Sequence, residues 1–254
     1  MSNELVIEQK QSLGNTGAQI GVQNNYGLSV SDATQMAFGI FREHYPQLKE
    51  ELLQSLRSMV LDELTKQNPS TIVTPNPRIA VPSLQGASIT EEESVRRLYA
   101  KLLASDMNGN VSDMVHPAFT KIIDQMSAFD AMLLKKIFEI NDSIPVARIT
   151  FTFGSKYLTS VMPHYFSSYF DSFEDRWKTS IGIENLSRLK LIHLFEGQVT
   201  TFDYSQFKSH PFVIDRFEFA RANNPNRIFE INVSEYVIQL NDFGKQFIKV
   251  CLPT

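Results

Sequence analysis

One stretch decides the fold: residues 89–140, ITEEESVRRLYAKLLASDMNGNVSDMVHPAFTKIIDQMSAFDAMLLKKIFEI. It carries three helix-start signals in close succession, each followed by an apolar stripe. In the first signal, Glu93 lies three residues after Thr90, which is the spacing of a capping box that satisfies unpaired N–H groups of a first helical turn. The stripe that follows has helical spacing. Its members are Val95, Leu98, Tyr99, Leu102 and Leu103.

Two further helices are predicted in the same stretch. Pro117 is suited to a first helical position, because a proline loses no hydrogen bond there. Ser127 begins the third helix as its N-cap, with Asp130 one turn inside. The expected buried faces are Phe119, Ile122, Ile123 and Met126 in the second helix, and Phe129, Leu133, Ile137 and Phe138 in the third. Residues 89–140 therefore predict a compact helical core.

Around this core we predict a mainly α protein with a smaller, winged-helix-like α/β unit at its C-terminal end. Residues 29–66 have helical periodicity interrupted at Pro46 and are interpreted as a helical pair. Residues 67–81 contain a proline-rich run that favours a linker or an extended strap. The body then runs over 82–254, helical in 82–142 and mixed in 143–254.

The mixed part shows alternating and helical segments in turn. Residues 146–153 alternate and are β-branched, which predicts a strand. Pro163 is expected to start a helix with an aromatic stripe, which we interpret as buried packing. A helix over 183–189, strands over 191–195 and 228–238 and a helix over 242–250 resemble a winged helix, although the long connection 197–227, with a helix near 213–222, is too long for a simple wing.

A winged helix could read DNA through the residues that its recognition helix exposes. Those residues would be Asn185, Arg188 and Lys190. From residue 180 onward, however, lysines and arginines number eight and acidic residues also number eight, whereas phosphate binding requires a surplus of basic charge. A DNA-binding transcriptional regulator is therefore the alternative hypothesis, and a role in protein association is favoured.

Residues 13–27, LGNTGAQIGVQNNYG, alternate between two kinds of side chain. An extended chain would place amides and glycines on one face and apolar residues on the other, which suits stacking in register as amide ladders and a dry zipper. The segment resembles amyloid signalling motifs. A flexible leader, or a single strand on the folded body, is the other interpretation. The expected self-association residues are Asn15, Gly17, Gln19, Ile20, Gly21, Val22, Gln23 and Asn25.

The helical core also carries a family resemblance. Pro82, the run Gly86-Ala87-Ser88, the helix through 98–104, the run His116-Pro117-Ala118-Phe119 and the pattern around Asp130 resemble the Abi-alpha (abortive-infection alpha) proteins, as do residues 184–192 and 240–247. Tyr99 stands where tryptophan or another aromatic is expected. The resemblance implies a bacterial protein of phage defence, and it implies no active site.

Composition limits the remaining classes of function. The 254 residues are 43% hydrophobic and 20% charged, and the net charge of −4 argues against a general nucleic-acid binder. The single cysteine, Cys251, fits a reducing compartment, and the chain shows neither a signal peptide nor a transmembrane run, so we expect a cytoplasmic protein. No metal-binding, nucleotide-binding or nucleophile motif is present. We therefore expect no enzyme activity and no cofactor; the partners would be proteins, either copies of the chain or proteins with a similar motif, and an oligomer would follow from such contacts.

Overall fold

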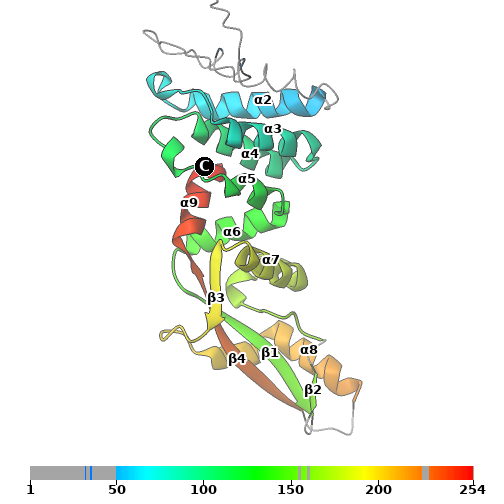
Figure 1. Cartoon of the computed structure of the whole chain (residues 1–254). Coiled ribbons are helices and arrows are strands. Elements are labelled where there is room, and N and C mark those ends of the chain that lie inside the picture. The colour runs from blue at the N-terminus through cyan, green and yellow to red at the C-terminus, as the bar shows by residue number, and fades with distance from the viewer. Residues whose placement is uncertain are drawn as a thin grey trace, which may run out of the picture.

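The computed structural model describes residues 50–153, 156–158, 161–224 and 229–253, together with the helical residues Asp32 and Gln35. The molecule is elongated, with stacked helices at one end and a twisted sheet at the other (Figure 1). The prediction of a mainly helical protein with a smaller α/β unit is confirmed. None of the helices in the described ranges has the length and apolar character needed to cross a membrane.

Three of the described helices lie in the upper part of Figure 1: α2 (Glu50–Thr65), α3 (Pro77–Ile89) and α4 (Glu93–Asp106). The stripe predicted for α4 is buried, since Leu102 and Leu103 are inaccessible to solvent and Tyr99 is nearly so. Glu63 links α2 to α4 through an ion pair with Lys101 at 2.9 Å. Burial opposes ionisation of Glu63, but hydrogen bonds from Lys66 and Lys101 lower its pKa below the usual value.

Two details of this region differ from the sequence predictions. The capping box at Thr90 is wrong: α4 has Glu92 as its N-cap, while the Thr90 hydroxyl donates to the carbonyl of Gly86 in the last turn of α3. The predicted linker over residues 67–81 is also wrong in its second part, because Pro77 occupies the first turn of α3, where a proline is tolerated. The part before it is a strap that includes the short helix η1 (Pro69–Thr71).

Helices α5 (Ala118–Ile123), α6 (Ala128–Ile140) and α9 (Asp242–Cys251) continue the stack. The predicted start of α6 is confirmed, because Ser127 and Asp130 form a reciprocal capping box. Helix α9 packs against α4, and the hydroxyl of Ser105 donates to the carbonyl of Val250 at 2.9 Å. Residues from the last quarter of the sequence thus complete the core of the first helices.

The sheet contains four antiparallel strands in the order β2-β1-β4-β3. They are β1 (Ile144–Phe153), β2 (Lys156–Leu158), β3 (Ile192–Glu196) and β4 (Phe229–Leu240). One face of β1 is covered by α8 (Pro211–Ala222) and the short helix η4 (Tyr204–Ser209), which form a second core with it. Helix α7 (Arg176–Arg188) leads into β3.

The helix predicted from Pro163 is wrong. Residues 163–174 form turns and the short helix η3 (Ser168–Phe170), and α7 begins only after its N-cap Asp175. Phe166 and Phe170 are buried as expected, but they enter the core from irregular backbone, where Ala147 and Phe166 exchange two backbone hydrogen bonds. Helix α7, β3 and β4 follow one another in this order, but η4 and α8 lie between the two strands, and the winged-helix interpretation stays a prediction.

Asp106 lies buried at the last residue of α4, where its Oδ2 accepts a hydrogen bond from the backbone N–H of Asn76 at 2.7 Å. Burial raises the pKa of this carboxyl to about 6, and the hydrogen bond opposes that change. The folded state therefore holds the proton more tightly than the unfolded chain. The contribution of Asp106 to the free energy of unfolding falls as the pH rises from about 4 to about 6 and stays low above that range.

We expect Asp106→Asn to raise the free energy of unfolding at about pH 7.5 by roughly 1–2 kcal/mol, because the amide keeps an acceptor for Asn76 and removes a buried charge. The fall in stability between about pH 4 and 6 should shrink in the same variant. Denaturant titrations across this range measure both effects. Asp62→Asn, at an exposed position of α2, removes the same charge and is the matched control; we expect it to change the free energy of unfolding at about pH 7.5 by less than about 0.5 kcal/mol.

Candidate functional site

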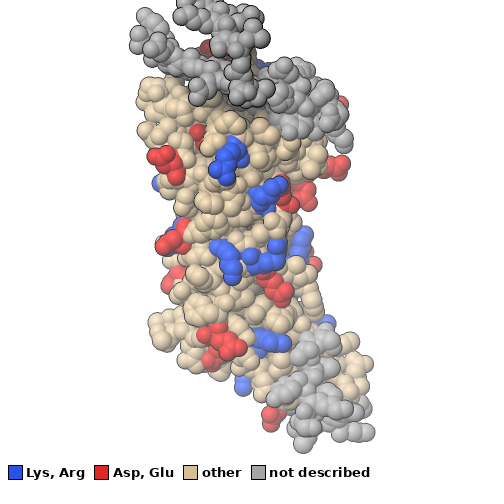
Figure 2. Space-filling view, viewed as in Figure 1, with Lys and Arg blue, Asp and Glu red and all other residues tan. Residues whose placement is uncertain are grey.

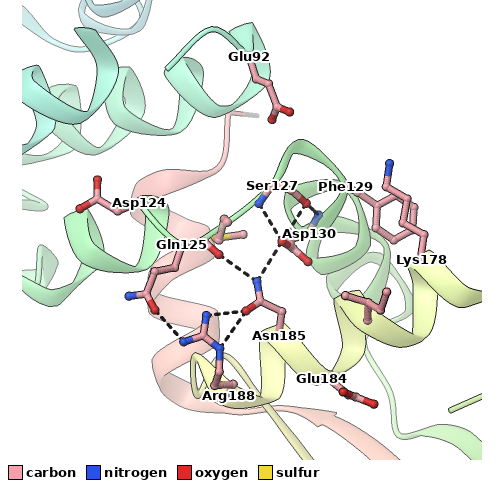
Figure 3. Close-up of a pocket in the computed structure, with 13 residues that line it drawn as sticks. Glu92, Asp124, Gln125, Ser127, Phe129, Asp130, Lys178, Glu184, Asn185 and Arg188 are labelled. Atoms are coloured by element: carbon pink, nitrogen blue, oxygen red, sulfur yellow. Dashed lines mark hydrogen bonds between the residues drawn. The ribbon is translucent and has the colours of Figure 1, made fainter. Parts of the chain in front are cut away.

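A groove of about 930 Å³ lies where α6 and α7 meet the loop between α5 and α6 (Figure 3). Gly182 allows the two helices to approach closely, since a Cβ at this position would lie 2.8 Å from Cδ2 of Leu133. The residues that line the groove are Glu92, Asp124, Gln125, Met126, Ser127, Phe129, Asp130, Lys178, Ile181, Gly182, Glu184, Asn185 and Arg188.

The centre of the groove is a hydrogen-bonded carboxylate. Oδ2 of Asp130 accepts from the backbone N–H of Ser127 at 2.8 Å, from the Ser127 hydroxyl at 2.9 Å and from Nδ2 of Asn185 at 3.0 Å. Nδ2 of Asn185 also donates to the carbonyl of Gln125 at 3.0 Å. One amide from α7 thereby fixes both the N-terminus of α6 and the loop before it, as the dashed lines of Figure 3 show.

Arg188 extends this network along α7. Its Nη1 donates to Oε1 of Gln125 at 2.7 Å, and its Nη2 donates to Oδ1 of Asn185 at 2.7 Å. Two of the three residues predicted for DNA contact are therefore joined to each other and bonded to the helical core. Lys190 lies apart from them, after the end of α7, with a φ of 61° and its carbonyl accepting from Nδ2 of Asn241.

Asp130, Gln125 and Glu92 are not among the site residues predicted from the sequence. Glu92 reaches the groove from the start of α4, where its Oε2 accepts from the backbone N–H of Ala128 at 3.0 Å. The N-cap signal at Ser127 was visible in the sequence, but the partner in α7 was not. Asp130 and Asn185 are 55 positions apart.

Large apolar side chains border the polar network. Ile181 in α7 is 67% exposed, and Ile89 at the end of α3 is 76% exposed. Ile89 lines a second, smaller groove that shares Glu92, Asp124 and Met126 with the first. Lys178 lies over the Phe129 ring, 5.1 Å from its centroid. The face shown in Figure 2 carries basic and acidic side chains interspersed.

The ionisable side chains of this region serve mainly as partners in structural hydrogen bonds. Tyr99 donates a short hydrogen bond to Asp124, and burial, aided by this contact, raises the pKa of its hydroxyl far above the usual value, so the tyrosine keeps its proton. Burial likewise raises the pKa of the Cys251 thiol, which makes it a poor nucleophile. Within the described parts of the chain, no group of three or more histidines, cysteines or acidic residues could hold a metal ion.

The predicted self-association residues between Asn15 and Asn25 lie outside the described residues, so their role stays a prediction.

Comparisons with known proteins identify the chain at the level of a family. No curated protein and no solved structure matches it. The family model described as abortive infection alpha matches residues 48–251, which include every helix and strand from α2 to α9. The resemblance seen in the sequence is thereby confirmed, and the chain belongs to the abortive infection alpha family.

Proposed function

We propose that this protein is a non-enzymatic phage-defence protein that acts through association with other proteins. Family membership suggests a role in abortive-infection defence. The groove between α6 and α7 and the sequence of residues 13–27 support association without catalysis.

The proposal rests on a difference between two kinds of side chain at the groove: the central polar groups are hydrogen-bonded within the protein, and apolar side chains are exposed to solvent. Its central polar groups, Asp130, Asn185 and Arg188, bind one another and the main chain. Ile181, which lines the groove, and Ile89, which lines the smaller groove beside it, are large, apolar and exposed. Exposed apolar side chains beside a polar rim are typical of protein interaction sites, whereas catalysis requires polar groups that are available to a substrate.

The DNA-binding alternative receives less support from the same residues. A recognition helix reads base edges with side chains that project from the protein. Asn185 instead faces α6, and both terminal nitrogens of Arg188 have protein acceptors. Tight, sequence-selective DNA binding at physiological salt, measured by fluorescence polarisation, would nevertheless reverse this preference.

The proposed trigger is homotypic stacking of residues 13–27. These residues carry no charge and no proline, and their alternation would give each added strand a backbone ladder, an amide face and an apolar face. Stacking on a second copy, or on a similar motif of a partner, would raise the local concentration of the folded body. Weak contacts at the groove would then become effective through multivalency.

Ile181→Asp tests the groove in the full chain. We expect it to reduce phage protection by about 100-fold or more in a plaque assay, because a charge at the apolar border opposes desolvation by a partner. Ile181 is mainly exposed, so the fold should persist and circular dichroism should be unchanged. Phe219→Asp, at a 53% exposed position of α8, is the matched control and should retain protection. Equal protection by both variants would show that no partner needed for protection binds at Ile181 in the groove.

A further inference from the structure

Strand β3 forms one edge of the sheet. It pairs with β4 on one side, and no strand in the described ranges pairs with its other side. His193, Phe195 and Glu196 are exposed along it. An edge of this kind offers free backbone donors and acceptors to an added strand.

The register shows which backbone groups point outward. Gly197 N–H donates to the carbonyl of Glu235 at 3.1 Å, so residues 197 and 235 form a hydrogen-bonded pair. Such pairs alternate along an antiparallel ladder, and therefore Phe195 with Val237 is also a bonded pair. Ile192, Leu194 and Glu196 occupy the non-bonded pairs, and their N–H and C=O groups face away from β4.

We propose that residues 13–27 of the same chain pair with this outer edge of β3 in the monomer. The inference rests on the proposed function, because it names what regulates the stacking segment: docking and stacking use the same backbone groups, so a docked segment cannot stack. Residues 13–27 would thus stay paired with the β3 edge, and unable to stack, until a similar strand from another molecule displaces them.

The side chains of the segment fit the edge. Strand addition places successive side chains on alternate faces, so Ile20 and Val22 would share a face, as His193 and Phe195 do. Phe195 is 43% exposed, and an apolar residue opposite it would remove that ring from water. The amide and glycine positions would then lie beside Leu194 and Glu196. The absence of charge in residues 13–27 leaves nothing to oppose Glu196.

The connection is long enough. Twenty-two residues, 28–49, separate the segment from α2; they reach at most about 73 Å when extended, which is about twice the length of the path that they must follow. Helices α4 and α9 lie between α2 and β3, and α9 leads directly back along β4. Two helix diameters of about 10 Å and the roughly 15 Å length of α9 make a path of about 35 Å.

Residue-resolved amide hydrogen exchange of the full-length monomer tests the docking. We expect the amides of Leu194 and Glu196 to exchange more slowly in the wild type than in the double variant Gly21→Pro/Val22→Pro, by a factor of about ten or more. The two prolines remove two neighbouring backbone N–H groups, which point to opposite sides of an extended strand. The amide of Val237, bonded to Phe195 inside the sheet, should remain protected in both proteins and reports that the sheet is intact.

A second pair of variants tests the receiving edge. Glu196→Pro removes an outward N–H, and a proline is tolerated at such edge positions; Glu196→Ala removes the same carboxylate and keeps the N–H. We expect Leu194 to lose its protection in the proline variant and to keep it in the alanine variant.

Each result decides a separate point. Equal exchange at Leu194 in the wild type and the double-proline variant would overturn the docking, whatever the segment does in isolation. Protection that grows over a tenfold rise in protein concentration would also overturn it, because the strand would then come from another copy. If Leu194 is protected but a peptide of residues 13–27 never stacks, the docking stands and the proposed trigger fails.

Discussion

Replacing Gly244 by alanine is expected to destabilise the protein by about 3 kcal/mol or more, the range of severe overpacking. Gly244 lies in the first turn of α9, where its N–H donates to Oδ1 of the N-cap Asn241 at 2.7 Å. A Cβ here would overlap the carbonyl oxygen of Leu191 and lie 2.9 Å from its carbon. These are backbone atoms between α7 and β3, so no side-chain rotation can relieve the overlap.

The matched control is Gly197→Ala. A Cβ at Gly197 would meet the ring of Phe195 at 3.3 Å, and this exposed ring can move aside. We therefore expect a change within about 0.5 kcal/mol. Denaturant unfolding monitored by circular dichroism compares the two variants at equal m-values. Similar midpoints would mean that the contact between α9 and Leu191 relaxes more readily than its geometry indicates.

Ile20→Asp is expected to abolish phage protection while leaving the helical body folded. A stacked isoleucine contributes on the order of 1.5–3 kcal/mol if fully buried. Aspartate loses this term and places like charges at every 4.7–4.8 Å repeat, which adds about 1 kcal/mol of repulsion for each neighbour at the dielectric constant of water. The measurements are a plaque assay with the intact chain and fibre diffraction of a peptide of residues 13–27.

Ile20→Val is the control for this substitution, because valine keeps a β-branched apolar side chain and should retain both protection and the cross-β pattern. The stacking hypothesis fails if the aspartate variant protects cells as well as the wild type. It also fails if the wild-type peptide stays monomeric at high concentration and cannot be seeded by a partner motif.

Local signals in the sequence predicted the elements that depend on neighbouring residues. Ser127 and Asp130 mark the start of α6 because a capping box is formed within four residues. The same pattern at Thr90 and Glu93 predicted a cap that does not exist, since Thr90 bonds back to Gly86 in α3. The aromatic residues after Pro163 have near-helical spacing, but Tyr169 and Trp177 are exposed. Phe166 is buried through contacts with β1 and η4, which are remote in sequence.

The candidate site could be predicted only in part for the same reason. Helical spacing places Asn185 and Arg188 on one face of α7, and the structure brings them together. Whether that face meets solvent or protein depends on Gln125 and Asp130, which no local pattern connects to α7. The exposed Ile89 and Ile181 were likewise not separable from core residues by periodicity alone.

The position of α9 has a consequence for how the protein is made. Val250 and Cys251 are buried, and α9 packs against α4, although about 140 residues of chain separate the two helices. A nascent chain emerging from the ribosome will carry α2 to α6 with their α9-facing apolar surface uncovered until α9 itself is released. The body is therefore completed only late in translation. Ribosomes that stall before residue 242 will release fragments that lack α9 and keep this apolar surface exposed, which makes them prone to proteolysis.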